Sequence, residues 1–307
     1  MKTRPIQVLY SDSAVVAVNK PPGLPVHEAP GPGGSVLRAL RLQHGLSGLT
    51  PAHRLDKDAS GVLLLARTKK AARALERQWQ TVEKTYLALC EGIPSADAGL
   101  VDAPILEHQT GKPERLRNAL RFFSELNPGV TVPPPPPPKT SAVHPAGRSA
   151  QTEYRVIEAF GRGQSAGGIG SGGAGGPKER KEARGWSWLE VRPRQGRMHQ
   201  IRVHLARIGC PIVGDRLYGV QSSVSGTRPG RHGGSGPRPA GFGLGRLALH
   251  AAKLVFPNPN KPGKRLTVEA PMADDLAALL ERLRSAGKPR TSGAAKSEKS
   301  PFKHFVV

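Results

Sequence analysis

The stretch PAHRLDKDASGVLLLA, residues 51–66, places charged side chains directly before one of the most apolar segments of the chain. Asp56 and Asp58 lie in a polar turn, and the following run GVLLLAR (61–67) predicts a buried strand. Removing a charge from water costs free energy, so we expect charged side chains beside the start of a buried strand to have a structural or functional role. Either the acids hydrogen-bond the backbone of their own turn, or they line a functional cleft. The turn interpretation fits Asp58 better than Asp56.

A glycosidase-like pair of carboxylates is a poor interpretation of this turn. Such pairs flank the substrate from opposite sides, with carboxyl groups about 5 to 9 Å apart. Asp56 and Asp58 belong to one tight turn, which places both acids on the same side of any substrate.

Charge and composition narrow the class of protein. The 307 residues carry a formal net charge of +23, which favours a polyanionic partner, nucleic acid rather than an acidic membrane. Cys90 and Cys210 stand alone, so we expect buried reduced thiols and neither a disulfide framework nor a zinc site. No apolar run is long enough to span a membrane, and the first residues lack the apolar core of a signal peptide. We therefore expect a cytoplasmic protein.

Periodicity predicts strands interspersed irregularly with helices. Strands are expected within 13–24, at 61–67, 84–92, 151–160 and 186–193, within 246–259 and at 265–271. Helices are expected at 35–42, 68–80, 197–209 and 274–286. Thr68 suits an N-cap, Gly209 a helix end, and Asp274 and Asp275 the positive end of the last helix.

Low-complexity segments interrupt this pattern without dividing it into self-sufficient halves. They lie near 127–147, which includes six consecutive prolines, and near 161–185 and 220–245. Insertions between strands cost little, because loop-closure entropy rises only logarithmically with length. We expect one α+β domain over residues 1–286 and a basic, disordered tail over 287–307.

A second cluster of functional residue types occupies RPRQGRMHQIRVHLARIG, residues 192–209. Ile201, Leu205 and Ile208 form the apolar stripe of the predicted helix, which leaves Arg202 and the 197–199 corner off the core-facing side. Arginine, histidine and glutamine beside a helix start suit contact with phosphate, although a solvated basic face is the alternative. His199 and His204 are not spaced for one helix face, so we predict no metal site.

The order of motifs resembles the RluA-type pseudouridine synthases, outside the low-complexity segments and over roughly residues 6–275. The motifs are NKPPGLPVH (19–27), HRLDKDASGVLLLAR (53–67), KTYLALCEG (84–92), WLEVRPRQGRMHQIRVHLARIGCPIVGDRLYG (188–219) and RLALHAAKLVF (246–256). The resemblance implies a single catalytic domain with a largely antiparallel mixed sheet, flanking helices and a central RNA-binding cleft. It also implies an isomerase that converts uridine in rRNA or tRNA to pseudouridine without metal or cofactor. No long apolar stripe is left over in the sequence, so we expect a monomer with no membrane attachment and no obligatory protein partner.

The resemblance also assigns residues. It implies that Asp56 is the catalytic aspartate, that Tyr86 is the tyrosine of the pocket and that Arg202 is the basic residue beside the aspartate. A carboxylate can add covalently to the sugar or the pyrimidine ring, and a neighbouring guanidinium favours its ionised form. Arg54 inherits the role of filling the space left by the flipped base. RNA contacts are further expected from His53, Arg197 and His199.

This chain departs from the family pattern at Ala59 and Met198, where relatives commonly carry threonine. Neither position replaces a proposed catalytic group, although a hydrogen bond that orients the Asp56 loop could be lost. There are two alternatives. One is an RNA-binding or RNA-remodelling protein that kept the scaffold without catalysis, and the other is a ribosome-assembly or chromatin accessory protein driven by its basic tail and insertions. The presence of Asp56, Tyr86 and Arg202 counts against the first.

Overall fold

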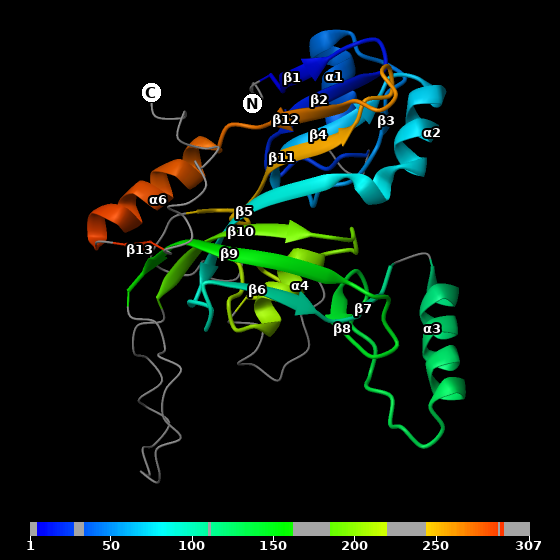
Figure 1. The fold of residues 1–307 in the computed structure, drawn as a ribbon, viewed down its shortest axis with the longest axis vertical. Coiled ribbons are helices and arrows are strands. Elements are labelled where there is room, and N and C mark those ends of the chain that lie inside the picture. Colours follow the sequence, from blue (N-terminus) through cyan, green and yellow to red (C-terminus); the bar gives the residue numbers. More distant parts are fainter. Residues whose placement is uncertain are drawn as a thin grey trace.

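The computed structural model describes residues 5–27, 34–109, 112–161, 185–219, 244–287 and 289–291, and in it a mixed sheet of eleven strands runs through the molecule (Figure 1). The strands of this sheet are β1 (Gln7–Ser11), β2 (Val15–Lys20), β3 (Thr50–Pro51), β4 (Ser60–Ala66), β5 (Glu83–Glu91), β6 (Ala98–Asp102), β9 (Gln151–Phe160), β10 (Trp186–Pro193), β11 (Leu249–Pro257), β12 (Arg265–Glu269) and β13 (Arg290–Thr291). The central path runs β1-β2-β4-β11-β5-β10-β9-β13, with β12 on β11, β3 on β4 and β6 on β9. The expectation of an α+β fold with a largely antiparallel sheet is confirmed.

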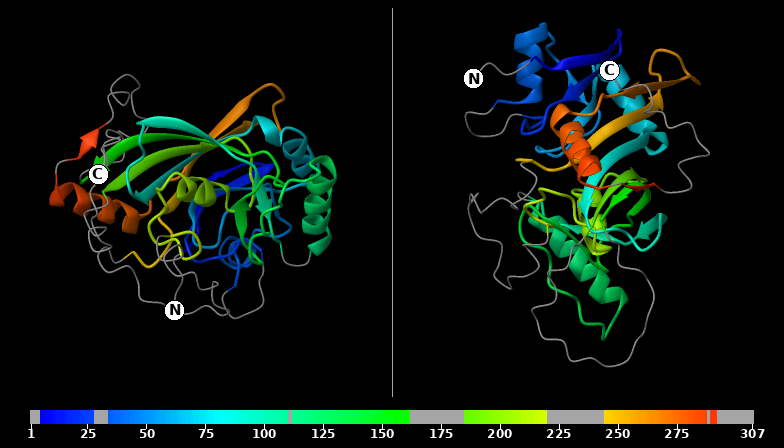
Figure 2. Two further views of the ribbon diagram at one scale, coloured as in Figure 1. Left: turned by 90° about the horizontal axis from the view of Figure 1, so that it is seen from below. Right: turned by 90° about the vertical axis from the view of Figure 1, so that its left-hand side faces the viewer.

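Helices and a small second sheet surround these strands. The helices are α1 (Val36–His44), α2 (Lys69–Arg77), the 3-10 helix η1 (Trp79–Thr81), α3 (Pro113–Leu126), α4 (Gln200–Arg207) and α6 (Asp274–Ala286). β7 (Ile105–Glu107) and β8 (Ser141–Val143) pair with each other in the second sheet. Figures 1 and 2 show α3 and α6 at opposite sides of the molecule.

Both faces of β2 and β4 are covered, which explains why their sequences are apolar throughout. On β4, Leu63 and Leu65 pack in the core that contains Val36 of α1. Leu64, which points to the other face, packs in the core that contains Leu75 of α2. A third core joins β5 and β10 to α4 and α6.

The glycine of the opening motif permits a close approach between strands. Among the described residues, β4 and β11 form the only parallel pair, in which Ala251 lies opposite Gly61. Gly61 has φ of +110°, and a Cβ built on it would lie 2.2 Å from the Ala251 carbonyl oxygen. Any other residue would therefore force apart the two strands that carry the Asp56 loop and the pocket wall.

The expected elements are present, with two helix boundaries corrected. The helix expected at 68–80 ends at Arg77, and the 3-10 helix η1 follows it. Thr68 caps α2 by accepting a hydrogen bond from the Ala71 amide at 3.1 Å. The helix expected at 197–209 begins only at Gln200, because His199 adopts a left-handed conformation with φ of +58° and a turn replaces the first residues. It ends before Gly209, whose φ is +77°.

The sequence analysis missed structure around the proline run. Helix α3 lies immediately before the 127–147 segment, and β8 lies within it. Two histidines anchor the prolines, since a ring nitrogen of His108 lies 2.7 Å from the Pro136 oxygen and one of His144 lies 2.8 Å from the Pro133 oxygen. Most of the segments predicted at 161–185 and 220–245 lies outside the described residues.

The start of the predicted tail is ordered instead of disordered. Arg290–Thr291 pairs with β9 as β13, and Arg290 forms an ion pair with Asp97 at 2.8 Å. Residues 292–307 lie outside the described part of the chain. Cys90 and Cys210 are both free and buried, as expected. Within the described ranges, no helix has the length and apolar character needed to cross a membrane.

Lowering the pH from 7 to 5 is expected to destabilise the fold through His250. Its imidazole is fully buried 2.9 Å from the Ser60 hydroxyl, and burial lowers its pKa to about 4. The unfolded histidine takes up a proton near pH 6.5, so the stability that neutral His250 contributes is complete above about pH 6.5 and is lost as the pH falls towards 4. Between pH 7 and 5, the unfolding free energy should fall by about 2 kcal/mol more in the wild type than in His250→Gln. Urea denaturation measures this, and equal falls would contradict it.

Candidate active site

The loop that carries Asp56 is tied to the first motif by a buried lysine. Lys20, at the end of β2, is fully buried and its ammonium donates to the carbonyl oxygens of Pro21, Leu24 and Lys57, each at 2.8 Å. The amide of Gly23 also donates to the Lys57 carbonyl, at 2.9 Å. The NKPPG turn therefore fixes the backbone next to Asp56.

Arg202 of α4 contacts Asp56 at the cavity, as the sequence analysis predicts. Its Nη1 lies 3.1 Å from Asp56 Oδ2, and its Nε and Nη2 each donate to a separate oxygen of Asp215 at 2.8 Å. The Asp215 side chain is fully buried. Burial opposes the charge of Arg202, but the hydrogen bonds and charge of Asp215, followed by Asp56, raise its pKa. A permanently charged guanidinium thus bridges a buried anchor and a partly exposed carboxylate.

A second basic group approaches Asp56 from the corner before α4. His199 Nε2 lies 3.9 Å from Asp56 Oδ1, and His199 Nδ1 lies 2.9 Å from the Tyr218 hydroxyl. That hydroxyl accepts a hydrogen bond from the Ser141 amide at 2.9 Å, so its own hydrogen is available to His199. Burial, only partly offset by Asp56, lowers the pKa of His199. A neutral His199 that accepts from Tyr218 carries its hydrogen on Nε2, the nitrogen that faces Asp56.

Loss of the Tyr218 hydroxyl should therefore lower the stability of the protein. In a Tyr218→Phe variant, the Ser141 amide loses its acceptor, which we expect to lower the unfolding free energy by about 1 to 3 kcal/mol. Urea denaturation measures the loss. Tyr10→Phe is the matched control, because the Tyr10 hydroxyl only donates to the side chain of Asp12 near the surface. Equal effects of the two substitutions would contradict this role of Tyr218.

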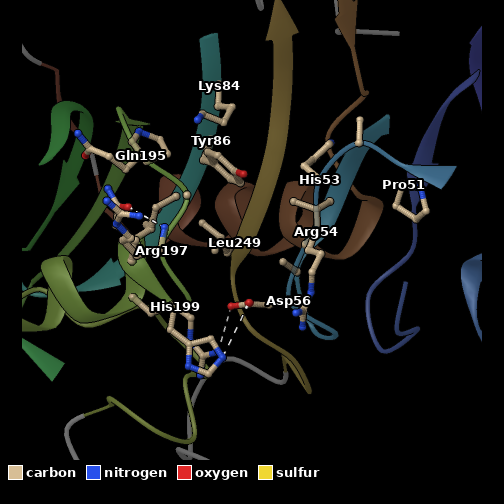
Figure 3. A pocket seen from close by; sticks show the side chains of 18 of the residues that line it. Pro51, His53, Arg54, Asp56, Lys84, Tyr86, Gln195, Arg197, His199 and Leu249 are labelled. Carbon is tan, nitrogen blue, oxygen red and sulfur yellow. Dashed lines mark hydrogen bonds and ion pairs between the residues drawn. The ribbon is translucent and has the colours of Figure 1, made fainter. Parts of the chain in front are cut away.

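A cavity of about 460 Å³ opens beside Asp56. Tyr86 of β5 and Leu249 of β11 line its wall, and Figure 3 shows both between the Asp56 loop and the turn that precedes α4. Burial, followed by the charge of Asp56, raises the pKa of Tyr86, so its side chain remains a neutral phenol. The cavity presents a carboxylate, an aromatic ring and a hydroxyl to whatever enters it.

Every site residue expected from the sequence lines this cavity. They are Asp56, Tyr86, Arg202, Arg54, His53, Arg197 and His199. Arg54 is exposed at the rim next to Asp56 (Figure 3). Arg197 donates two hydrogen bonds to the Ser149 carbonyl, both at 3.1 Å.

His53, from which the sequence analysis expects an RNA contact, is held by two contacts within the fold. Its Nε2 accepts a hydrogen bond from the Leu64 amide at 3.1 Å, and its ring stacks on Trp79 with centroids 5.3 Å apart. Burial, followed by the charge of Lys84, lowers the pKa of His53 to about 4. The ring is therefore neutral and presents an aromatic surface, not a charge, to the cavity.

The sequence analysis did not single out Lys20, Lys84, Asp215 or Tyr218. All four lie inside the motifs that it quoted, NKPPG, KTY and GDRLYG. The available signal was an ionisable residue within or beside an apolar run, as for Asp215 directly after IVG.

Ala59 and Met198, where the chain departs from the family pattern, both form hydrogen bonds through their backbone amides. The Ala59 amide donates to the Asp56 carbonyl at 3.2 Å, and the Met198 amide donates to the Glu107 carboxylate at 3.1 Å. Both contacts use backbone groups, which any residue other than proline supplies.

Comparison with known proteins identifies the class. Residues 14–207 match the family model described as RNA pseudouridylate synthase. The chain belongs to this family, and it is an RNA isomerase of the pseudouridine synthase type.

The relatives include bacterial and vertebrate proteins. The chain is 34% identical over 288 residues to ribosomal large subunit pseudouridine synthase D of Xanthomonas campestris pv. campestris, covering 91% of this chain and 70% of the relative. It is 31% identical to the mitochondrial pseudouridylate synthase RPUSD4 of Xenopus tropicalis, covering 91% of this chain and 80% of the relative. The fold is similar to that of human RNA pseudouridylate synthase domain containing 4, with a TM-score of 0.58 at 24% identity, covering 91% and 93% of the two chains.

Proposed function

We propose that this enzyme converts uridine to pseudouridine in large-subunit ribosomal RNA, with the Asp56 carboxylate as nucleophile. The observation that carries the proposal is the contact of 3.1 Å between Asp56 and a permanently charged Arg202 at the cavity. The relatives named ribosomal large subunit pseudouridine synthases support the choice of RNA. The net charge of +23 supports binding to a polyanion.

The side chains of the cavity suit each part of this reaction. The target nucleotide leaves its stack and enters the cavity, at a cost of a few kcal/mol. Asp56 adds to the sugar or the pyrimidine ring, the N1–C1′ bond breaks, the base turns, and C5 bonds to C1′. The proton leaves C5 and N1 gains one, so the product is an isomer of the substrate.

Arg202, Tyr86 and His199 then have separate roles around the reacting groups. Arg202 keeps Asp56 ionised and aligned, because opposite charge favours the carboxylate. The neutral ring of Tyr86 supports the base, and its hydroxyl assists proton movement. Arg54, at the rim, occupies the space that the base vacates, and His199 and Arg197 hold the neighbouring backbone.

Mapping of modified sites tests the substrate. Unmodified transcripts of large-subunit rRNA and a pool of unmodified tRNA are incubated with the wild type and with Asp56→Asn, and pseudouridine is detected by carbodiimide-blocked primer extension. We expect discrete stops in the large-subunit rRNA with the wild type alone. Stops confined to tRNA would overturn the choice of RNA, and identical patterns for the two proteins would overturn the enzymatic role of Asp56.

The proposal also covers the domain organisation, location and oligomeric state of the enzyme. Residues 1–286 form one catalytic domain that carries low-complexity insertions, and the basic tail from 287 adds affinity for RNA without sequence preference. The enzyme acts in the cytoplasm as a monomer and needs no protein partner or cofactor. Binding to RNA weakens steeply as salt rises, since phosphate contacts release counterions.

A further inference from the structure

Lys84 is a buried cation that the reaction described above does not use. It lies two residues before Tyr86 on β5, so both side chains project from the same face of the strand into the cavity (Figure 3). The residue is only 9% exposed. No described residue offers its ammonium a hydrogen bond or an ion pair.

The other buried cations of the structure all have partners. Lys20 donates to carbonyl oxygens at 2.8 Å, Arg202 binds Asp215 at 2.8 Å, and Arg246 binds Asp275 through two hydrogen bonds. Lys84 differs from them, although burial lowers its pKa in the same way that it lowers that of Lys20. Among the described residues, Ser141 Oγ is the only buried side-chain nitrogen or oxygen without a partner, so the Lys84 ammonium reaches the water of the cavity. A cation that faces a cavity without a protein anion beside it is open to an anionic ligand.

The surroundings of Lys84 match a strand of nucleic acid. His53 lines the same cavity and stacks on Trp79 with ring centroids 5.3 Å apart, which places aromatic surface beside the cation. His53 is neutral, so Lys84 is the charged group of this pair and would be the one to bind an anion. A cation combined with aromatic surface is the usual means of holding a single strand.

The position of Lys84 along the cavity points to the backbone of the RNA. Figure 3 shows Tyr86 between Lys84 and Asp56. The sugar of the target nucleotide must lie at Asp56, so a group held by Lys84 belongs to the far side of that nucleotide or to its neighbour. A phosphodiester carries a full negative charge that can pair with the Lys84 ammonium, whereas a uracil carbonyl is neutral.

We infer that Lys84 forms an anion subsite that binds a phosphodiester group of the RNA strand entering the cavity. The inference rests on the proposed function, because it assigns this subsite to the same substrate. It adds a contact that positions the target nucleotide independently of the charges around Asp56.

Equilibrium binding tests the subsite without catalysis. All proteins carry Asp56→Asn, and the probe is a fluorescent oligouridylate of about 12 nucleotides, long enough to fill one single-strand binding site. Lys84→Met should weaken binding about tenfold at low salt, as expected for a lost charge-assisted hydrogen bond. The slope of log K against log salt should fall by about 0.7. Lys84→Arg should retain the slope.

Lys253→Met is the matched control, because it removes the same charge outside the cavity. Lys253 lies on β11 and forms an ion pair with Glu269 at 3.0 Å. We expect its affinity to stay within about twofold of the parent.

The stability of the unliganded variants separates binding from a structural role. Because the ammonium has no partner among the described residues, Lys84→Met should keep or raise the melting temperature. A lower melting temperature would assign Lys84 to the fold and overturn the inference. Weaker binding with an unchanged salt slope would place Lys84 on the base, and unchanged affinity would remove it from the site. Failure of the proposed function is read separately, as absence of pseudouridine with the wild type.

Discussion

Replacing Asp56 by asparagine should abolish pseudouridine formation while leaving a folded protein that still binds RNA. Asparagine has nearly the same size and can still accept from Arg202, but it is a far weaker nucleophile than a carboxylate. We expect turnover to fall by more than about 10⁴-fold, the scale seen when a covalent nucleophile is removed. Single-turnover assays with unmodified rRNA measure the loss, and anisotropy and urea denaturation measure binding and stability.

Asp58→Asn is the matched control for this substitution. Asp58 lies two residues away in the same turn, is exposed, and does not line the cavity. We expect its turnover to stay within about threefold of the wild type, because surface substitutions away from such contacts have small effects. If Asp58→Asn were as inactive as Asp56→Asn, the turn as a whole and not the Asp56 carboxylate would limit the rate. If Asp56→Asn failed to fold, Asp56 would be a structural turn residue.

Removing the buried anchor of Arg202 should cost both stability and activity. The Asp215 side chain is fully buried, and in an Asp215→Ala variant Arg202 would keep only the partly exposed Asp56 as an anionic partner, besides its position over the Tyr218 ring. Breaking a buried ion pair in this way typically costs about 3 to 5 kcal/mol. The two backbone amides that bind Asp215, those of Leu217 and Tyr218, would also lose their acceptor. Urea denaturation measures the change in unfolding free energy.

An exposed ion pair provides the control for the buried pair between Asp215 and Arg202. Glu153 and Arg194 form an ion pair at 2.7 Å in which both side chains are about half exposed. Glu153→Ala should lower the unfolding free energy by less than about 1 kcal/mol, because solvent screens exposed charges. Comparable losses for Asp215→Ala and Glu153→Ala would show that Asp215 is not the anchor that the geometry indicates.

The sequence predicts those parts of the fold that depend on local patterns. The continuous apolar runs of β2 and β4, the Thr68 cap and the end of α4 at Gly209 follow from periodicity and turn chemistry. The order of the strands does not follow, since pairing of β4 with β11 joins segments that are far apart in the chain. The start of α4 depends on the left-handed conformation of His199, which no local pattern indicates.

The candidate site likewise contains residues that the sequence predicts and properties that only the folded structure reveals. The resemblance to a family supplied Asp56, Tyr86 and Arg202, and all three lie at one cavity. The charge state of His53 was not predictable, because it depends on burial and on Lys84 of another strand. Asp215 was not predicted either, because only the folded structure shows that its carboxylate is buried and binds Arg202.

The central claim is that Asp56, held by Arg202, breaks the bond between uracil and ribose so that C5 can replace N1. Tritium placed at C5 of uridine is released to water when that carbon bonds to the sugar, so tritium release counts reaction events directly. With rRNA labelled in this way, the account predicts time-dependent release by the wild type, in a one-to-one ratio with pseudouridine formed, and only background release by Asp56→Asn. Equal release by the two proteins at matched concentrations of bound RNA would contradict it.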